Sequence, residues 1–185
     1  MKIFTAAAAL ETLGKNYQYK TQIAFDKNLY IFSNGDPTLG SWRYDGYKPE
    51  HFISKIIETL KSRNIKEISG DLVIDDTYFD FQKIPGGWPY NDIGNYYGAG
   101  VWGVNWRENQ FDINTFGKAF KNFNINLEGV HFVNDTRTEG TSDRSIIFTT
   151  PYNDVAHVTG TLPAKNLTIS GATPNPPKQL ALEIV

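Results

Sequence analysis

The chain has 185 residues, a length that fits one sizeable hydrophobic core or two small ones. Its 18 basic and 20 acidic side chains give a net charge of −2, so we expect no basic surface for nucleic acid. The absence of cysteine excludes disulfides and thiol nucleophiles, and no apolar run approaches the roughly 20 residues of a membrane span, which predicts no transmembrane segment.

The first predicted element is an apolar helix over residues 1–14, rich in alanine and followed by a stop at Gly14. Residues 3–13 leave almost no polar face, which predicts that the helix is buried all round. Lys2 is the exception, because an ammonium without water is costly unless a site uses it. Two alternatives stay open: a signal peptide with a cleavage site at residues 6–8, and a solvated lysine in the first helical turn.

A small α/β unit is predicted next. Residues 17–25 and 28–32 alternate in hydrophobicity and predict a hairpin with a tight turn between its strands. Apolar residues at helical spacing predict a helix over 49–63, and a short apolar run predicts a buried strand at 72–74. In the turn between hairpin and helix, we expect Asp36 to cap the turn's own amides rather than to take part in catalysis.

Three aspartates, Asp75, Asp76 and Asp80, lie at the end of that strand and just beyond it. Adjacent carboxylates attract divalent cations, but neighbouring side chains at a strand end point to opposite faces. We therefore expect local caps and no metal site. The three histidines, at positions 51, 131 and 157, lack the spacing of zinc ligands, so no metal or other cofactor is predicted.

Residues 86–106 form an aromatic loop, with three Trp, three Tyr, many glycines and no basic side chain. This composition excludes a regular helix and is typical of loops that line a functional groove. Two explanations stay open from the residues alone. The rings could pack together as the core of the loop, or their faces could form a platform for carbohydrate.

Beyond residue 101 the pattern predicts an antiparallel β-rich subdomain, because short alternating segments are separated by clusters of Gly, Asn, Asp and Thr. The predicted strands are 105–116, 124–132, 145–150, 155–162 and 167–170. Asn175-Pro176-Pro177 then breaks the chain, and residues 178–185 have the pattern of a starting helix.

Several strings, taken in order, resemble the D-alanyl-D-alanine carboxypeptidase/endopeptidase family, the low-molecular-mass class C penicillin-binding proteins. The strings are the alanine-rich helix that starts at Lys2, G-D-P-T-L at 35–39, G-D-L-V-I-D-D at 70–76, G-W-P-Y-N-D at 87–92 and G-T-L-P at 160–163. The resemblance implies an α+β fold, in which a penicillin-binding/β-lactamase-like transpeptidase domain begins and a large inserted region follows.

The implied boundaries divide the chain into four parts. Residues 1–18 would be the active-site helix of the transpeptidase domain, and 19–100 an inserted α/β subdomain that carries the aromatic loop. Residues 101–170 would be the β-rich inserted subdomain, and 171–185 the segment that returns to the transpeptidase domain.

The resemblance also implies a function: a serine-type D-Ala-D-Ala carboxypeptidase/endopeptidase that acts on peptidoglycan stem peptides through an acyl-enzyme. In this family the Lys of S-x-x-K helps to deprotonate the Ser, so Lys2 is the implied catalytic base. The Asp of G-W-P-x-N-D and an aromatic residue five positions on recognise the stem-peptide side chain, which implies Asp92 and Tyr97. A carboxylate pairs with an ammonium such as that of a diaminopimelate-like side chain, while a ring packs along its methylenes.

The resemblance further implies β-lactam binding by the complete enzyme and a periplasmic or extracytoplasmic location, although no signal peptide is predicted in this chain. We expect an incomplete, inactive fragment that lacks the nucleophilic Ser and the S-x-N and K-T-G motifs. Ser142-Asp143-Arg144 ends in Arg, and Lys20-Thr21-Gln22 ends in Gln. The alternative function is a non-catalytic β-rich module that binds glycan or peptide through residues 88–106.

Overall fold

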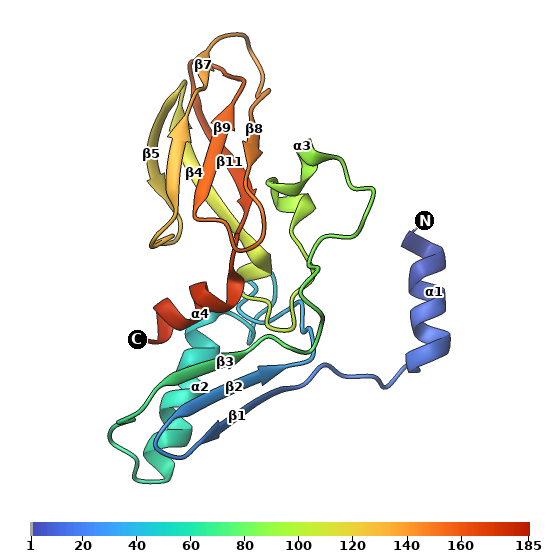
Figure 1. Cartoon of the computed structure of the whole chain (residues 1–185), viewed down its shortest axis with the longest axis vertical. Helices are drawn as coiled ribbons and strands as arrows, with labels where there is room; N and C mark the ends of the chain where they lie inside the picture. Colours follow the sequence, from blue (N-terminus) through green and yellow to red (C-terminus); the bar gives the residue numbers. More distant parts are fainter. Residues whose placement is uncertain (1) are drawn as a thin grey trace.

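The structure, a computed structural model, describes residues 2–185 and begins with helix α1 (Lys2–Leu13). All residues of α1 are exposed, with Ile3 and Phe4 at 82% and 80%. Figure 1 shows the helix standing apart from the rest, at the end of an extended segment. The expected burial on all sides is therefore wrong for the described chain, because no element of residues 2–185 covers α1. Met1, which the predicted helix includes, lies outside the described residues.

The first compact unit is a three-stranded sheet with one helix packed against it (Figure 1). β1 (Thr21–Phe25) and β2 (Leu29–Ser33) form the predicted antiparallel hairpin, and β3 (Leu72–Asp75) runs parallel to β2. Helix α2 (Pro49–Ser62) connects β2 to β3, and Pro49 occupies its first turn, where the missing N–H leaves no hydrogen bond unmade. The predicted strand, helix, strand order is confirmed.

The core of this first unit includes residues from much later in the chain. Its buried members are Leu29, Ile31, Leu39, Ile56, Val104, Trp106 and Leu180. Trp106 comes from the aromatic loop, and Leu180 comes from the C-terminal helix α4 (Pro176–Ile184). Asn175 caps α4 by accepting a hydrogen bond from the Lys178 N–H at 3.0 Å, so the predicted C-terminal helix is confirmed.

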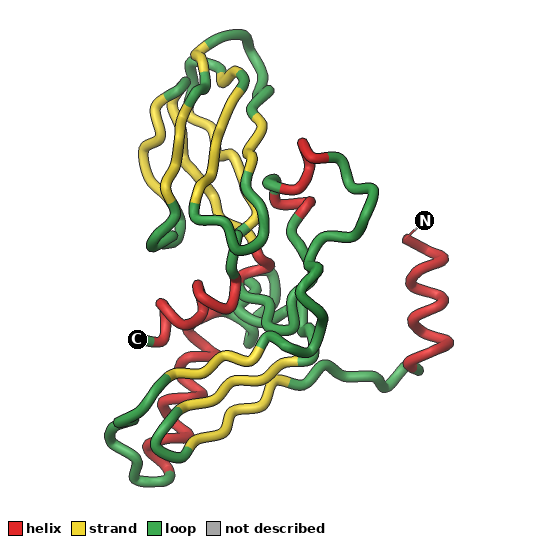
Figure 2. Tube along the Cα trace, viewed as in Figure 1, coloured by secondary structure: helices red, strands yellow, loops and turns green. Residues whose placement is uncertain are grey.

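The second unit consists of two small sheets that share a core. In one sheet, β4 (Gln110–Phe116) pairs antiparallel with both β11 (Asn166–Ala172) and β5 (Ala119–Phe123). In the other, β9 (Val155–Thr159) lies between β6 (His131–Asn134) and β8 (Ile146–Phe148). The two sheets bury a common set of side chains: Phe111, Ile113, Ile125, Ile147, Val158, Leu162 and Ile169. Figure 2 shows these strands at the opposite end of the molecule from β1 to β3.

Two details of the predicted β-rich part are wrong. The part is not wholly antiparallel, since β6 pairs parallel with β9, and β7 (Arg137–Thr138) pairs parallel with β10 (Thr161–Leu162). Residues 135–154 supply the long crossover that a parallel β6–β9 pair requires. The predicted strand at 124–132 is mostly loop: β5 ends at Phe123, before this range, and β6 begins only at His131. Gly117, with a φ of 54°, makes the tight turn into β5 that the pattern missed.

The two units meet at a short left-handed turn, η2 (Arg107–Asn109), whose three residues have φ between 52° and 56°. Residues other than glycine adopt this left-handed backbone conformation only when contacts with their surroundings stabilise it. Arg107 donates to the Glu183 carboxylate of α4 at 2.9 Å, and Glu108 accepts from Arg43 Nε at 2.7 Å. The turn is thus held by one contact with the loop before α2 and one contact with α4.

The structure is an α+β arrangement of small sheets, as expected from the sequence. Among residues 2–185, no helix has both the length and the apolar character needed to cross a bilayer. The four-part division of the chain stays a prediction.

Strand β4 offers a matched pair of phenylalanines for testing the second core. Phe111 is fully buried and lies so close to Gly171 that a Cβ there would come within 2.3 Å of its ring, whereas Phe116 is exposed. We expect Phe111→Ala to lower the free energy of unfolding by about 3–5 kcal/mol, because it leaves a cavity. Phe116→Ala should change it by less than about 1 kcal/mol. Urea unfolding followed by circular dichroism measures both, and similar losses would contradict the assigned core.

Candidate functional site

The aromatic loop of residues 86–106 crosses from the first unit to the second and is fixed to the second by its backbone (Figure 1). It contains two short helices, α3 (Tyr90–Ile93) and η1 (Tyr96–Gly98). Between them, the carbonyl of Gly94 accepts a hydrogen bond from the N–H of Ala172 in β11 at 2.9 Å. The loop therefore continues the edge of the sheet that contains β11.

Two glycines permit the tight packing of this loop. A Cβ on Gly94 would lie 2.0 Å from the carbonyl oxygen of Ile147 in β8, and a Cβ on Gly98 would lie 1.9 Å from the carbonyl oxygen of Asp92. No side chain fits at either distance, so both positions require glycine. The second contact folds η1 back against the end of α3.

Asp92 and Tyr97, the two predicted substrate-binding residues, lie together as a result of this fold. The hydroxyl of Tyr97 donates a long hydrogen bond of 3.4 Å to Oδ1 of Asp92. Tyr97 is 61% exposed and Asp92 is half-buried. Partial burial, and then the charge and hydrogen bond of Asp92, raise the pKa of Tyr97 above its usual value. The raised pKa keeps the phenol of Tyr97 protonated at neutral pH, beside the half-buried side chain of Asp92.

The remaining rings of the loop divide into two groups. Trp102 and Trp106 are fully buried, which agrees with the explanation that the rings form a core. Trp88, Tyr90 and Tyr96 are exposed. Tyr90 stacks on Phe148 of β8 with centroids 5.2 Å apart, and Tyr96 meets Tyr97 edge to face. Rings of this second group are available to a ligand.

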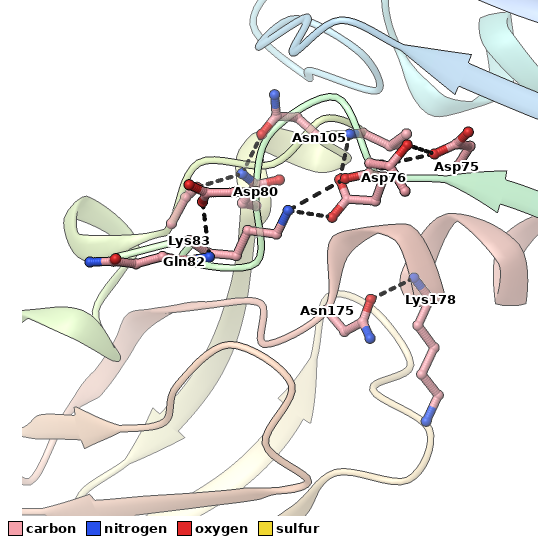
Figure 3. Close-up of polar contacts among 12 residues, drawn as sticks. Asp75, Asp76, Asp80, Gln82, Lys83, Asn105, Asn175 and Lys178 are labelled. Carbon is pink, nitrogen blue, oxygen red and sulfur yellow. Dashed lines mark hydrogen bonds and ion pairs between the residues drawn. The ribbon is translucent and has the colours of Figure 1, made fainter. Parts of the chain in front are cut away.

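A buried ion pair, which the sequence analysis missed, fixes the start of the loop (Figure 3). Lys83 Nζ lies 2.8 Å from Oδ2 of Asp76, and its side chain is 1% exposed. The ammonium also lies 5.1 Å from the centre of the Trp102 ring, and Oδ1 of Asp76 accepts the N–H of Val104 at 2.9 Å. One signal pointed to this pair: Lys83 is the only basic residue between Lys66 and Arg107 in the sequence.

The predicted capping roles are confirmed for Asp36, Asp75 and Asp80. A local cap is wrong for Asp76, because its carboxylate pairs with Lys83 and accepts the distant Val104 N–H. Asp36 accepts the N–H and hydroxyl of Thr38, and Asp75 accepts those of Thr77. The hydrogen bonds from the Thr77 side chain and backbone lower the pKa of Asp75. Asp80 accepts the N–H of Gln82 at 3.0 Å. Within residues 2–185, no group of three or more His, Asp or Glu side chains is arranged to hold a metal ion.

Lys2, the predicted catalytic base, is separated from the Asp92–Tyr97 pair. It lies in the exposed first turn of α1, and Figure 1 shows α1 well apart from α3. No hydrogen bond or ion pair joins Lys2 to Asp92 or Tyr97 in the described chain. The structure thus brings together two of the three predicted site residues.

The sequence analysis also missed one literal S-x-N string, Ser62-Arg63-Asn64. It lies at the end of α2, where the Ser62 hydroxyl donates to the Thr59 carbonyl at 2.8 Å. Asn64 has a φ of 58°, the left-handed conformation that commonly terminates a helix. The string therefore terminates a helix. The Ser62 hydroxyl is bonded to the backbone of the same helix, so it does not have the catalytic role of an S-x-N serine.

Comparison with known proteins decides the family. The model of the D-Ala-D-Ala carboxypeptidase 3 (S13) family matches residues 1–181. The chain belongs to this family. The family expected from the sequence is thereby confirmed, and the S13 match extends over both units and over α1.

Two curated relatives of this S13 chain have similar sequences over about half of it. A D-alanyl-D-alanine carboxypeptidase of Actinomadura sp. (strain R39) is 33% identical over 97 residues, 48% of this chain and 16% of the relative. The D-alanyl-D-alanine carboxypeptidase DacB of Haemophilus influenzae is 31% identical over 101 residues, 50% of this chain and 19% of the relative. The matched part is thus less than a fifth of either relative.

Two solved structures have a similar fold. Penicillin-binding protein 4 (dacB) from Haemophilus influenzae matches 99% of this S13 chain and 43% of its own, with a TM-score of 0.69 and 24% identity. The same protein complexed with a novel β-lactam matches with a TM-score of 0.60 and 20% identity. At these identities the likeness shows the fold, and the S13 chain covers less than half of either structure.

The buried ion pair of this S13 chain has an exposed counterpart that serves as a control. Asp76→Ala leaves the Lys83 ammonium buried without a partner, and we expect it to lower the free energy of unfolding by about 3–5 kcal/mol. Asp45→Ala removes the partner of Lys48 at the surface, where Asp45 is fully exposed, and should have no measurable effect. Thermal and urea unfolding compare the two variants, and equal stability would show that Lys83 does not depend on Asp76.

The hydrogen-bonded pair in the loop predicts how Tyr97 titrates. Asp92→Asn removes the negative charge that disfavours the phenolate, so the pKa of Tyr97 should fall toward the ordinary value of about 10. Partial burial persists in the variant and should keep the pKa of Tyr97 above that value. NMR titration of ¹³C-labelled tyrosine, with Tyr97 assigned through Tyr97→Phe, measures the change. Asp45→Asn is the control, and an unchanged Tyr97 in Asp92→Asn would contradict the contact.

Proposed function

We propose that this sequence is part of a serine-type D-Ala-D-Ala carboxypeptidase/endopeptidase that acts on peptidoglycan stem peptides outside the cytoplasm. The observation that carries the proposal is the Asp92–Tyr97 pair, which lies on the surface of the aromatic loop in a chain that the S13 family model matches over 181 residues. The curated relatives named as D-alanyl-D-alanine carboxypeptidases support the same reaction class.

The proposed role of the pair is to bind the side chain of the stem peptide. The carboxylate of Asp92 is half-buried, has one long hydrogen bond and is open to a cation. An ammonium paired with it would gain a charge-assisted hydrogen bond, and the exposed Tyr97 ring would cover the methylenes that lead to that ammonium. A diaminopimelate-like side chain has both features.

The proposed role of α1 is to form the active-site helix within a larger catalytic body. Its exposed apolar side chains, among them Ile3, Phe4 and Leu10, make an unfavourable surface in water. Packing of the transpeptidase domain around the helix would remove this surface and surround Lys2 with protein. The serine of the S-x-x-K box is not among the 185 residues.

The proposed chemistry is acyl transfer. A serine hydroxyl attacks the carbonyl of the penultimate D-Ala, and the neutral amine of Lys2 accepts the hydroxyl proton. The tetrahedral intermediate then expels the terminal D-Ala as its amine takes up a proton, and water hydrolyses the acyl-enzyme. β-Lactams would acylate the same serine in the complete enzyme.

The alternative candidate is a non-catalytic module that binds glycan or peptide through the aromatic loop. The observation that favours it is the exposure of Tyr90, Tyr96 and Tyr97 on one loop. The DNA upstream of Met1 distinguishes the two functions. In-frame codons for Ser-x directly before Met1 would favour the enzyme, and a stop codon there would favour the module.

The experiment that tests the enzyme uses the full-length protein that contains this sequence. We expect Asp92→Ala to lower kcat/KM on stem peptides with an ammonium side chain by about 10-fold to 100-fold, because a charge-assisted hydrogen bond is lost. Acylation by a fluorescent penicillin, which lacks that side chain, should be unchanged. Equal loss of both activities would count against side-chain recognition.

Two controls accompany this measurement. Asp45→Ala, at a fully exposed aspartate in the loop before α2, should leave both activities unchanged. The 185-residue chain alone should take up no fluorescent penicillin, because it contains no S-x-x-K serine. Covalent labelling of that chain would refute its proposed inactivity.

A further inference from the structure

An exposed pair of stacked rings lies outside the Asp92–Tyr97 pair. Phe81, in the loop after β3, is 80% exposed, and its ring is parallel to that of Tyr152, with an interplanar angle of 3° and centroids 5.0 Å apart. Tyr152 comes from the connection between β8 and β9, 71 positions later in the chain. The fold therefore assembles this surface from two distant segments.

Tyr152 is held rigidly in the pair. Its φ of 65° is left-handed, a conformation that bulky residues avoid unless their surroundings impose it. Its N–H donates to the Pro174 carbonyl at 2.8 Å, and its ring meets the buried Trp102 ring edge to face at 5.0 Å. Strained residues with such support cluster at ligand sites, and a support of this kind fixes the ring before any ligand arrives.

Phe81 is held by its neighbours in the sequence. The preceding Asp80 accepts the N–H of Gln82 at 3.0 Å, and Lys83, two residues after Phe81, is buried against Asp76. Its backbone is thus fixed on both sides, while its ring projects over Tyr152 instead of entering either hydrophobic core. A fixed, exposed Phe that stacks on a second exposed ring makes an aromatic patch, and exposed apolar patches mark interaction sites.

We propose that the Phe81–Tyr152 pair stacks against a pyranose ring of a glycan strand. The C–H groups on one face of a pyranose carry partial positive charge and fit the negative face of an aromatic ring. Asp80, Gln82 and Asn153 adjoin the two rings in sequence and are exposed. Each uses one side-chain atom for a hydrogen bond to nearby backbone, and its other polar atom can bond a sugar hydroxyl. This inference rests on the proposed function, because peptidoglycan supplies such a strand next to its stem peptides.

The charges near the rings favour a neutral sugar over an anion. Asp80 and Asp154 are exposed nearby in sequence, while the ammonium of Lys83 is buried and already paired. One stacked pair is also small for a protein partner, since a stable protein interface buries about 800 Å² on each side. A single saccharide unit matches the area of one ring face.

The test uses the 185-residue chain and a soluble β-1,4-linked hexamer of N-acetylglucosamine, which carries no peptide. NMR of ¹³C-labelled Phe and Tyr rings follows the titration, and we expect saturable shifts of Phe81 and Tyr152. Phe81→Ala should weaken binding about tenfold, because one stacking contact is lost. Phe81→Trp should bind at least as tightly as the wild type, and Phe116→Ala, an exposed Phe on β4, should bind like the wild type.

Three results would overturn the inference. The first is the absence of saturable shifts up to about 10 mM hexamer, a weak limit even for a single contact. The second is equal binding by Phe81→Ala and the wild type. The third is a dimer that dissociates on Phe81→Ala substitution, which would identify a second copy of the chain as the occupant. The hexamer has no stem peptide, so each result is independent of the Asp92 experiment.

Discussion

A buried ammonium fixes the arrangement of this chain. Lys83 is enclosed between the Asp76 carboxylate at the end of β3 and the Trp102 ring, and burial without that partner would be strongly unfavourable. The segment after β3 must therefore fold back toward the sheet. The same two residues also bind the far end of the aromatic loop. The Lys83 carbonyl accepts the Val101 N–H at 2.9 Å, and the Asp76 carboxylate accepts the Val104 N–H.

The middle of the loop is then free to reach the second unit. Gly94 contacts β8 and β11 through its backbone, and Gly98 lies against the carbonyl of Asp92. These contacts place the carboxylate of Asp92 and the phenol of Tyr97 next to each other at the surface. Side chains whose backbone is fixed by rigid strands in this way lose little conformational freedom when a ligand binds.

The sequence predicts the elements whose signals are local. The hairpin, α2 and α4 follow from periodicity, the caps at Asp36 and Asp75 follow from turn chemistry, and Asp92 and Tyr97 follow from a family motif. The isolated Lys83 hints at a buried partner, but Asp76 lies seven positions earlier across an irregular loop, so no periodic pattern gives the pair. The pairing of Phe81 with Tyr152 joins distant segments, and no local pattern reveals it. The exposure of α1 was missed for a related reason: its composition indicates a need for burial but not which element meets that need.

The left-handed turn at Arg107–Asn109 has a consequence for the stiffness of the molecule. Its conformation is held by two ion pairs, Arg107–Glu183 and Arg43–Glu108, whose side chains all retain some contact with solvent. Buried hydrogen bonds of Asn109 also hold it, because Asn109 Oδ1 accepts the Trp106 N–H at 3.1 Å and its carbonyl accepts the Thr173 N–H at 2.8 Å. Dissolved ions screen such pairs, whereas the strand ladders within each unit are insensitive to them. Added salt should therefore weaken the two ion pairs but not the buried hydrogen bonds of Asn109, so the junction between the units loses stiffness while it keeps its geometry.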